Sequence, residues 1–423
     1  MVYDLLIVGG GVSGFSAAIT AARHGKTVCI LEQGRKPLRK LAASGNGRGN
    51  LLNLHPNEAR YHGDSAFAMQ VLGNDAPQEA IQFWQSIGVS LTVEQQELLY
   101  PASLWAQSAV DALVLAANLL DVNIISNACA QKAEYQNQHF VVSGTLGIPV
   151  FPEKPNKNKE PQVKTEPAHW RAHRLLVCGG GRAALREGSP DTYALMQTFG
   201  HTLTPLLPAL CALRTKEKPS EHLQGVRVRC TCSLLNQDGK CKRQSAGEAL
   251  FAKDGISGIA VMDLARYVSE ADILSLDLRE AVCGNAGINL FDWLKNRRAL
   301  LQNRKCGDFL TGAVHPALFT EVLKRCRLRD EEQVFNLSDD LLWRIADVLI
   351  HFNYELKGPR SFEQAQVTAG GIVASDFDPI TLQSHLQPGL YAAGEMLNVD
   401  GDCGGFNLLF ALMSGIRVGE SMK

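Results

Sequence analysis

The chain lacks any apolar run long enough to span a bilayer, and no basic, apolar leader precedes its first strand-like segment. It also lacks an excess of charge of either sign, because 42 lysines and arginines are matched by 43 acidic residues and the formal net charge is −1. This balance gives no electrostatic basis for binding nucleic acid or an anionic membrane surface. We therefore expect a cytoplasmic protein that acts on a small molecule, with no nucleic-acid or membrane partner. The sequence leaves the oligomeric state open.

Paired-cysteine motifs are also missing, although the chain contains 11 cysteines. No CxxC spacing occurs, which argues against a disulfide reductase. Cys230 and Cys232 form one close pair, but no second pair or neighbouring histidine completes a zinc set. The scattered thiols indicate a reducing, cytoplasmic environment, and we expect no metal site.

Glycine motifs stand near both ends of the chain. At the start, a strand-like run at 3–8 leads into Gly9–Gly14 and then into an alanine-rich helical stretch. A second strand-like run at 27–31 ends on Glu32. This order of strand, glycine turn, helix, strand and acid is typical of a dinucleotide-binding unit, and is more specific than the glycine spacing alone.

Each residue type in this motif has a physical reason. Gly9 permits the tight turn from strand to helix, Gly11 lets the backbone approach a pyrophosphate, and Gly14 lets helix and strand pack closely. Glu32, 18 residues beyond Gly14, is placed to accept hydrogen bonds from ribose hydroxyls. A carboxylate there favours a nucleotide with a free 2′-hydroxyl.

The second glycine motif lies near the C-terminus, where Gly389–Glu395 is followed by Gly404–Asn407 and a closing helix. Gly404 and Gly405 permit close backbone approach, and a helix that begins near Asn407 directs N–H donors at its ligand. Such a helix end favours negative charge on the group that it faces. The two ends therefore predict one cofactor scaffold with insertions between them.

A second glycine run, Gly179–Gly181 with Ala184, leaves open a separate pyridine-nucleotide site. However, residues 186–190 would stop a helix, and no strand ending in an acid follows about 20 residues later. We favour a segment that returns the chain to the first domain. Residues 149–167 are rich in proline and lysine and predict a solvated hairpin insertion.

The chain of 423 residues is long enough for about three domain-sized units. Short strand-like pieces separated by polar turns give way to helical periodicity in its second half. We predict an FAD domain in two parts, 1–200 and 361–423, interrupted by a β-rich insertion at 201–275 and a small helical insertion at 276–360.

Four segments resemble the bacterial NAD(P)/FAD-dependent oxidoreductases that include aminoacetone-oxidase-like and BaiN-like flavoproteins: Gly9–Gly14 with Glu32, Arg39–Asn50, Ala365–Gly371 and Gly389–Asn407. The resemblance covers nearly the whole chain. It implies an α/β fold with a glutathione-reductase-type FAD-binding Rossmann domain and inserted β-barrel-like and helical domains. It also implies non-covalent FAD, with NAD(P)H as a transient electron donor. The residues predicted to contact the cofactor are Gly9, Gly11, Ser13, Gly14, Glu32, Gln33, Lys40, Ser44, Gly45, Gly47, Arg48, Asn50, Ala130, Gly179, Gly180, Gly394, Glu395, Asp400, Gly404, Gly405, Asn407 and Leu408.

The chain departs from the family at Gly49, where the family usually has cysteine between arginine and asparagine. If that cysteine shapes the flavin face, this protein should differ from its relatives in substrate or in reactivity toward oxygen.

No acid–base set is evident in the sequence. Histidines such as His62 and His351 are isolated. Arg48 and Arg360 are the candidates for binding a substrate carbonyl or carboxylate. For Arg360, a structural salt bridge is an equally good interpretation. We expect an FAD-dependent oxidoreductase that transfers hydride at flavin N5, either in amine oxidation or in reduction of an activated double bond. The alternative is a non-catalytic FAD-binding protein with a structural or sensing role.

Overall fold

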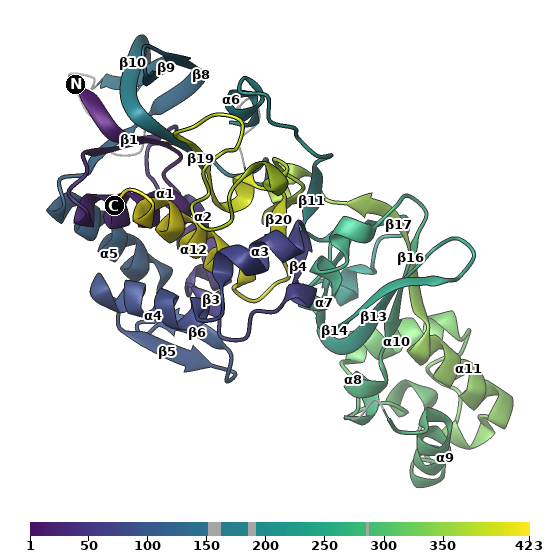
Figure 1. Ribbon diagram of the computed structural model, residues 1–423. Coiled ribbons are helices and arrows are strands. Elements are labelled where there is room, and N and C mark those ends of the chain that lie inside the picture. The colour runs from purple at the N-terminus through teal and green to yellow at the C-terminus, as the bar shows by residue number, and fades with distance from the viewer. Residues whose placement is uncertain (151–161, 185–191, 285–286) are drawn as a thin grey trace. The chain divides into compact units, whose positions relative to one another are not determined.

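The computed structural model describes residues 1–150, 162–184, 192–284 and 287–423, which divide into two compact units (Figure 1). Unit 1 is Met1–Leu207 with Val367–Lys423, and unit 2 is Pro208–Gln366. Unit 2 is therefore an insertion between two stretches of unit 1.

Unit 1 is built on a mostly parallel sheet. Among the described residues it has seven strands, in the order β7-β2-β1-β10-β9-β8, with β19 also paired to β10. Leu5, Leu6 and Ile7 are fully buried, as expected for a central parallel strand that is covered on both faces. Strands β8 and β9 extend the sheet in antiparallel fashion. The bounds are β1 Val2–Val8, β2 Val28–Glu32, β7 Asn123–Ser126, β8 Ala128–Gln136, β9 His139–Val150, β10 Gln162–Val177 and β19 Leu390–Ala392.

The register of the parallel strands brings four loops to one edge of this sheet. Val8 is paired with Leu31 on β2 and with Val177 on β10, and Val177 is paired with Ala392 on β19. The segments that carry the glycine motifs and Glu32 therefore begin side by side. Ligands bind at this carboxyl edge in α/β folds.

The second glycine run follows β10, which lies in the same sheet between β1 and β9. The glycine run therefore follows a strand of the main sheet. The described residues contain no separate βαβ unit around it. Residues 186–190, which were predicted to stop a helix, lie outside the described residues, as does most of the predicted insertion at 149–167. The ends of that insertion continue β9 and β10 as a hairpin, with Val150 paired to Gln162.

Helices α1 (Val12–Arg23) and α12 (Phe406–Glu420) cross closely in unit 1. A Cβ atom at Gly415 would overlap Ser16 Oγ, so the glycine is what allows the approach. The Ser16 hydroxyl donates a hydrogen bond of 3.0 Å to the Leu412 carbonyl across the crossing. The C-terminal helix is thereby fixed to the helix that follows the first glycine motif.

Residues 65–86 form two helices, α3 and α4. Gly73, with φ +68°, ends the first, and Pro77 occupies the first turn of the second. Among the described residues, no helix combines the length and the apolar character needed to cross a membrane. The other main elements of unit 1 are α2 Arg39–Ala43, α3 Ser65–Leu72, α4 Ala76–Ser86, α5 Ala106–Leu119, α6 Tyr193–Gln197, β3 Leu52–Asn53, β4 Tyr61–Gly63, β5 Leu91–Glu94, β6 Leu98–Pro101, β18 Val367–Ala369 and β20 Val399–Gly401.

Unit 2 contains a closed barrel with the strand order β12-β15-β14-β13-β16-β17. Cys230, Cys232 and Leu234 alternate with more exposed residues on β13 and are fully buried. Helices α8 to α11 come between β16 and β17 in the chain (Figure 1). The bounds are β11 Leu207–Ala209, β12 Leu213–Thr215, β13 Arg227–Leu235, β14 Cys241–Ala252, β15 Gly255–Ser257, β16 Ile273–Asp277, β17 Phe352–Pro359, α7 Ile259–Met262, α8 Arg279–Cys283, α9 Leu290–Leu300, α10 Pro316–Arg325 and α11 Asp339–Ile350.

The helical segment is shorter than the range 276–360 derived from the sequence. Residues 352–359 form β17, which pairs with β12 and β16 and completes the barrel. Phe352, Tyr354 and Leu356 are buried while the residues between them are exposed, which is the two-residue period of a strand. Helical periodicity that ends at Ile350 masked this alternation.

Candidate functional site

The first glycine turn joins β1 to α1 at the carboxyl edge of the sheet. Gly9 has φ +121°, and a Cβ atom there would lie 2.5 Å from the Cys178 carbonyl oxygen. A Cβ at Gly14 would overlap the Gly9 carbonyl oxygen, so Gly14 is required for close packing of helix on strand. Gly11 differs from both, because a Cβ there would meet no atom within 4 Å. The open face at Gly11 is the one suited to a phosphate at the start of α1.

Glu32 ends β2 and is bonded to this turn. Its Oε2 accepts a 2.9 Å hydrogen bond from the Gly10 N–H, and its Oε1 accepts one of 2.6 Å from Gly34. Burial raises the pKa of Glu32 above its ordinary value, although the two N–H donors and Arg39 act in the opposite direction. Each carboxylate oxygen keeps a lone pair with which to accept a ribose hydroxyl.

A polar chain joins three loops of unit 1. Lys40 Nζ lies 2.6 Å from Glu395 Oε2, and the other oxygen of Glu395 accepts a 2.9 Å hydrogen bond from the Thr368 N–H. The Thr368 hydroxyl in turn accepts a 2.8 Å bond from the Ala183 N–H. Gly180 has φ +80° and lies beside Lys40, because a Cβ there would be 4.0 Å from Nζ. The predicted residues Lys40, Gly180 and Glu395 are thus brought together.

The loop from Ser44 to Asn50 turns repeatedly through left-handed backbone conformations, with φ +56° at Gly45 and +82° at Gly47. It ends at Asn50, whose buried Oδ1 has no hydrogen-bond partner. A Cβ at Gly405 would lie 2.9 Å from this oxygen, so Asn50 faces the start of α12. A buried acceptor without a donor costs about 1–3 kcal/mol, and a bound group that presents an N–H there would recover it. The loop therefore fits a ligand such as a flavin ring.

Gly49 lies in this loop with φ +81°, but its Cβ direction leads into α5 and not into open space. A Cβ would lie 2.9 Å from Ala106 Cα and 3.3 Å from Pro101 Cδ. The expectation that a cysteine here would shape the flavin face is therefore not supported by its direction. The departure from the family concerns the packing of the loop on α5.

Gly49→Cys should lower the free energy of unfolding by about 1–3 kcal/mol, the usual cost of overpacking. Gly47→Cys is the matched control, because Gly47 has φ +82° but open space around its Cβ position. Urea denaturation of both apoproteins measures the difference. Equal losses would mean that backbone strain alone acts and that contact with Ala106 does not.

The start of α12 is formed by Gly404 and Gly405, with φ +117° and +94°. The Asn407 side chain holds the preceding loop: its Oδ1 accepts a 2.8 Å bond from the Gly401 N–H, and its Nδ2 donates a 2.7 Å bond to the Gly401 carbonyl. The side chain of Asn407 thus orders the loop, and the backbone N–H groups of the first turn remain the donors suited to a ligand. Leu408 is half-buried in that turn.

The remaining predicted residues fall around the same edge of unit 1. Gln33 is exposed beside Glu32, and Ala130 is buried in β8 at a register shift. A Cβ at Gly394 would lie 2.8 Å from Ser13 Oγ, so these two predicted residues are in contact. Further members of this group are Ser44 in the loop, Gly179 beside Thr192, and the buried Asp400 on β20.

The two candidate cations have carboxylate partners. The Arg48 guanidinium pairs with Glu94 and lies 5.0 Å from the centre of the Tyr100 ring. Arg360 pairs with Asp254 within unit 2. Because each arginine has a structural ion pair, we assign no substrate contact to either of them.

The structure brings together His62 and Asp402, which are far apart in the sequence. His62 Nε2 lies 2.7 Å from Asp402 Oδ1, and Arg60 Nη1 lies 3.3 Å from the other oxygen of Asp402. The sequence treats His62 as isolated, because no short-range spacing signals a partner 340 residues away. The pair lies where β4 meets β20, just before the glycines that start α12.

A second histidine network is buried and structural. His201 Nδ1 lies 3.2 Å from Asp376 Oδ2, and Nε2 lies 2.9 Å from Ser384 Oγ. Its side chain is fully buried and stacks on Phe377 with ring centres 4.6 Å apart. Burial lowers the pKa of His201, despite the opposing effect of Asp376. Because no substrate can reach this buried side chain, we assign His201 and its partners a structural role.

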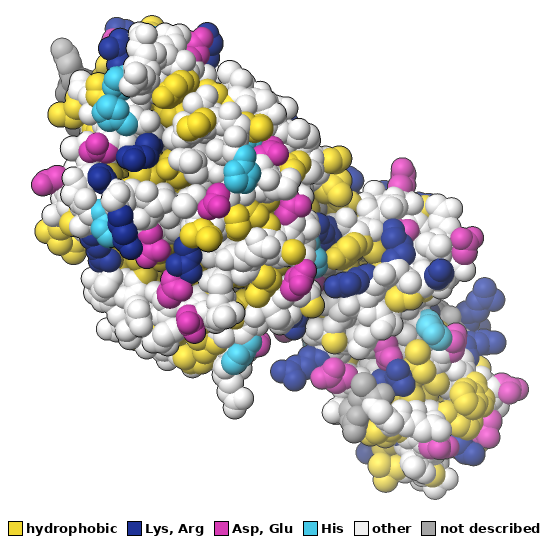
Figure 2. Space-filling model, viewed as in Figure 1, with side chains coloured by type: hydrophobic (Ala, Val, Ile, Leu, Met, Phe, Trp, Pro, Cys, Tyr) yellow, Lys and Arg dark blue, Asp and Glu magenta, His cyan; other side chains and the backbone are white. Residues whose placement is uncertain are grey.

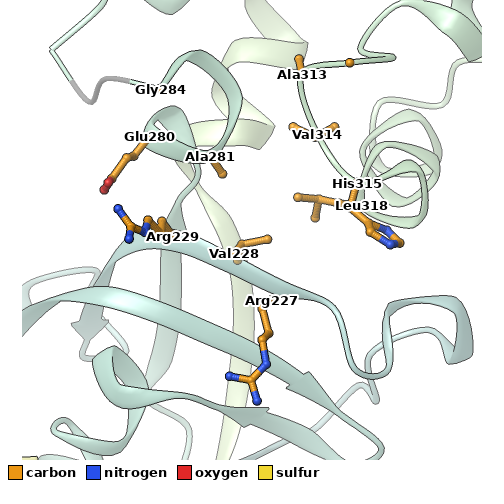
Figure 3. A pocket seen from close by; sticks show the side chains of 11 residues that line it. Arg227, Val228, Arg229, Glu280, Ala281, Gly284, Ala313, Val314, His315 and Leu318 are labelled. Carbon is orange, nitrogen blue, oxygen red and sulfur yellow. The ribbon is translucent and has the colours of Figure 1, made fainter. Parts of the chain in front are cut away.

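Unit 2 has a cavity of about 580 Å³ that none of the predicted cofactor residues line. Figure 3 shows it between the start of β13 and the segments that carry Ala281, Val314 and Leu318, with Arg229 and Glu280 at one end. The described residues contain no group of three or more histidine, cysteine or acidic side chains arranged to hold a metal. The dinucleotide features all belong to unit 1, so we place the candidate site there.

Comparison with known proteins decides the family. A model of the HI0933-like protein Rossmann domain matches residues 3–421. The chain belongs to this family. It is 30% identical to the 3-dehydro-bile acid Δ(4,6)-reductase of Clostridium scindens over an alignment of 437 positions. The alignment covers 98% of each protein. The resemblance and the Rossmann-type fold inferred from the motifs are confirmed, and the protein is a flavoprotein oxidoreductase.

More distant relatives also align along the whole chain. The ribosomal RNA dihydrouridine synthases of Haemophilus influenzae and Escherichia coli are 23% and 24% identical, and the alignments cover 99% and 97% of this chain and 98% and 96% of those proteins. A solved 3-ketosteroid-Δ4-(5α)-dehydrogenase from Rhodococcus jostii aligns with a TM-score of 0.48 and 15% identity, covering 99% of this chain and 96% of that one.

Proposed function

We propose that this protein is an FAD-dependent reductase that takes electrons from NAD(P)H and reduces a carbon–carbon double bond conjugated to a carbonyl group in a small molecule. The observation that carries the proposal is the chemistry common to its full-length relatives. One is named for reducing a 3-dehydro bile acid at Δ(4,6), and two for making dihydrouridine. In each case, a double bond in conjugation with a carbonyl gains two hydrogens. Amine oxidation has no counterpart among these three relatives.

The residues of unit 1 fit FAD in three places. The open backbone at Gly11 suits the pyrophosphate, and the Glu32 carboxylate suits the ribose. The unpartnered Asn50 oxygen beside Gly405 suits a ring N–H at the flavin end. These positions supply the contacts that the two ends of a dinucleotide need.

Bound FAD supplies hydride transfer at N5. The chain's own contribution is to hold and polarise the cofactor. The first turn of α12 would offer its backbone N–H groups to the flavin end of the cofactor and would favour negative charge there by about 1–2 kcal/mol. Lys40 is held by Glu395, which also fixes Thr368, so the loops on this side of the site have a defined geometry.

The purified protein should be yellow and should release intact FAD on heat denaturation. Chromatography of the released cofactor checks this. FMN in the supernatant, or a folded colourless protein that takes up no added FAD, would contradict the cofactor assignment.

Rapid mixing under anaerobic conditions tests the reaction. NADPH or NADH should bleach the flavin, and a 3-dehydro-4,6-diene bile acid or 2-cyclohexen-1-one should restore its colour, with one double bond of the added compound reduced for each flavin reoxidised. If neither enone reoxidises the flavin while aminoacetone reduces it, the enzyme is an amine oxidase and the proposal fails.

Ribosomal RNA is the rival substrate that the same experiment can detect. On the visible face of unit 1, Lys and Arg side chains are interspersed with Asp and Glu (Figure 2). Together with the net charge of −1, this disfavours RNA. Dihydrouridine formed in added ribosomal RNA, with no turnover of either enone, would replace the small-molecule part of the proposal.

A further inference from the structure

We infer that His62, held by Asp402, supplies the proton that the proposed reduction consumes. The inference rests on the proposed function. Reduction of a conjugated double bond needs a hydride at one carbon and a proton at the other, and the cofactor accounts only for the hydride. Some group of the chain must therefore be placed to deliver a proton.

His62 suits this role better than the other paired histidines. The described residues contain three histidine–carboxylate pairs: His62 with Asp402, His201 with Asp376, and His351 with Asp347. The His201 side chain is fully buried, whereas His351 is 57% exposed on α11 in unit 2. His62 and Asp402 are 11% and 12% exposed, so the pair is shielded from bulk water but remains open to the surface.

The pair is attached to the flavin end of the site. On the antiparallel strands β4 and β20, His62 is directly opposite Asp400, and β20 leads through Asp402 to the glycines that start α12. Asn407, in the first turn of α12, holds the Gly401 backbone through two hydrogen bonds. The position of His62 is thus fixed relative to the helix end that we assign to the flavin.

Asp402 is itself held firmly, which makes it an effective partner for the imidazole. Its Oδ1 contacts His62, its Oδ2 contacts Arg60, and its N–H donates a 3.0 Å hydrogen bond to the Arg60 carbonyl. Tyr61 points to the opposite side of the strand, where its hydroxyl donates to the Phe406 carbonyl. A carboxylate bonded to one ring nitrogen fixes the tautomer and the orientation of the imidazole.

Electrons and protons balance in the proposed reduction. Hydride adds to the carbon β to the carbonyl, and the electron pair of the double bond moves toward the carbonyl oxygen. The α carbon then takes a proton from the imidazolium of His62. NAD(P)H is oxidised, the substrate gains two electrons and two hydrogens, and neutral His62 regains a proton from water.

The test uses the full chain loaded with FAD and compares wild type with His62→Gln and Asp402→Asn. Reduction of the flavin by NADPH should be nearly unchanged in both variants. Reoxidation by 2-cyclohexen-1-one should slow about 100-fold or more, the usual contribution of a general acid. Reoxidation by ferricyanide, which accepts electrons without a proton, should stay close to wild type. Imidazole added to His62→Ala should restore part of the enone rate.

His351→Gln is the matched control, because it removes the His–Asp pair with a 2.9 Å contact in unit 2 and should alter none of these rates. A readout independent of turnover is the ¹⁵N spectrum of the apoprotein histidines. One slowly exchanging ring N–H should be seen in wild type and lost in Asp402→Asn.

The outcomes separate the two proposals. Wild-type enzyme that fails with every enone overturns the proposed function, and the inference falls with it. Wild-type turnover with equal enone rates in His62→Gln overturns the inference alone. Equal slowing with enone and ferricyanide also overturns it, because a proton donor cannot limit a reaction that uses no proton.

Discussion

Gly415→Val should destroy the stable fold of unit 1 and FAD binding with it. A Cβ at Gly415 would lie 2.9 Å from the Ser13 carbonyl carbon and would overlap Ser13 O and Ser16 Oγ. Two of these three atoms belong to the backbone of α1, so the clash cannot be relieved by a change of rotamer. The hydrogen bond from Ser16 to Leu412 would break as the helices separate. We expect a loss of about 3 kcal/mol or more, a large share of the roughly 5–15 kcal/mol that stabilises a typical protein.

Gly11→Ala is the matched control for Gly415→Val. It changes a glycine at the start of α1, but its Cβ enters open space and its φ of −87° suits any residue. Its apoprotein should unfold within about 0.5 kcal/mol of wild type. FAD affinity should still fall, because the methyl group occupies the space assigned to the pyrophosphate. Urea denaturation and FAD titration of both variants measure this, and loss of stability in Gly11→Ala would contradict the distinct roles of the two glycines.

The first glycine motif could be predicted because its physics is local. Gly9, Gly14 and Glu32 lie within one βαβ unit, where residue spacing and position in space are tightly linked. Family membership followed from the motif residues for the same reason. A β-rich insertion was predicted, and the strand β17 was missed although its alternation of apolar and polar residues is present in the sequence. The nearby helix supplied the stronger periodic signal.

Contacts between side chains that are far apart in the sequence could not be predicted. Lys40 meets Glu395 across 355 positions, and His62 meets Asp402 across 340. These pairs form because the C-terminal stretch returns to the sheet through β19 and then packs α12 on α1. A histidine and an aspartate so far apart carry no spacing signal, so the proton donor proposed above is visible only in the structure.

Glu32→Ala should weaken FAD binding by about 2–3 kcal/mol, as expected for lost hydrogen bonds to a charged acceptor. The substitution also leaves the N–H groups of Gly10 and Gly34 without their acceptor. Glu134→Ala is the matched control, because it removes a partly exposed carboxylate from β8 of the same sheet. Fluorescence titration of the apoproteins with FAD compares the dissociation constants. An unchanged value in Glu32→Ala would place the ribose elsewhere.

Acid should act on Glu32 in opposite directions with and without FAD. Burial raises its pKa in the apoprotein. Its contribution to stability is therefore fully present below the ordinary glutamate pKa of about 4.3 and is lost as the pH rises through the raised value.

FAD affinity should fall as the pH drops through that raised value, because ribose hydroxyls need the ionised carboxylate as acceptor. Glu32→Gln removes the titrating group and should flatten both pH dependences. Denaturation and FAD titrations over a pH window that starts below the ordinary glutamate pKa of about 4.3 and extends upward test this. A wild-type FAD affinity that stays constant across the window would mean that the Glu32 carboxylate does not bind the ribose.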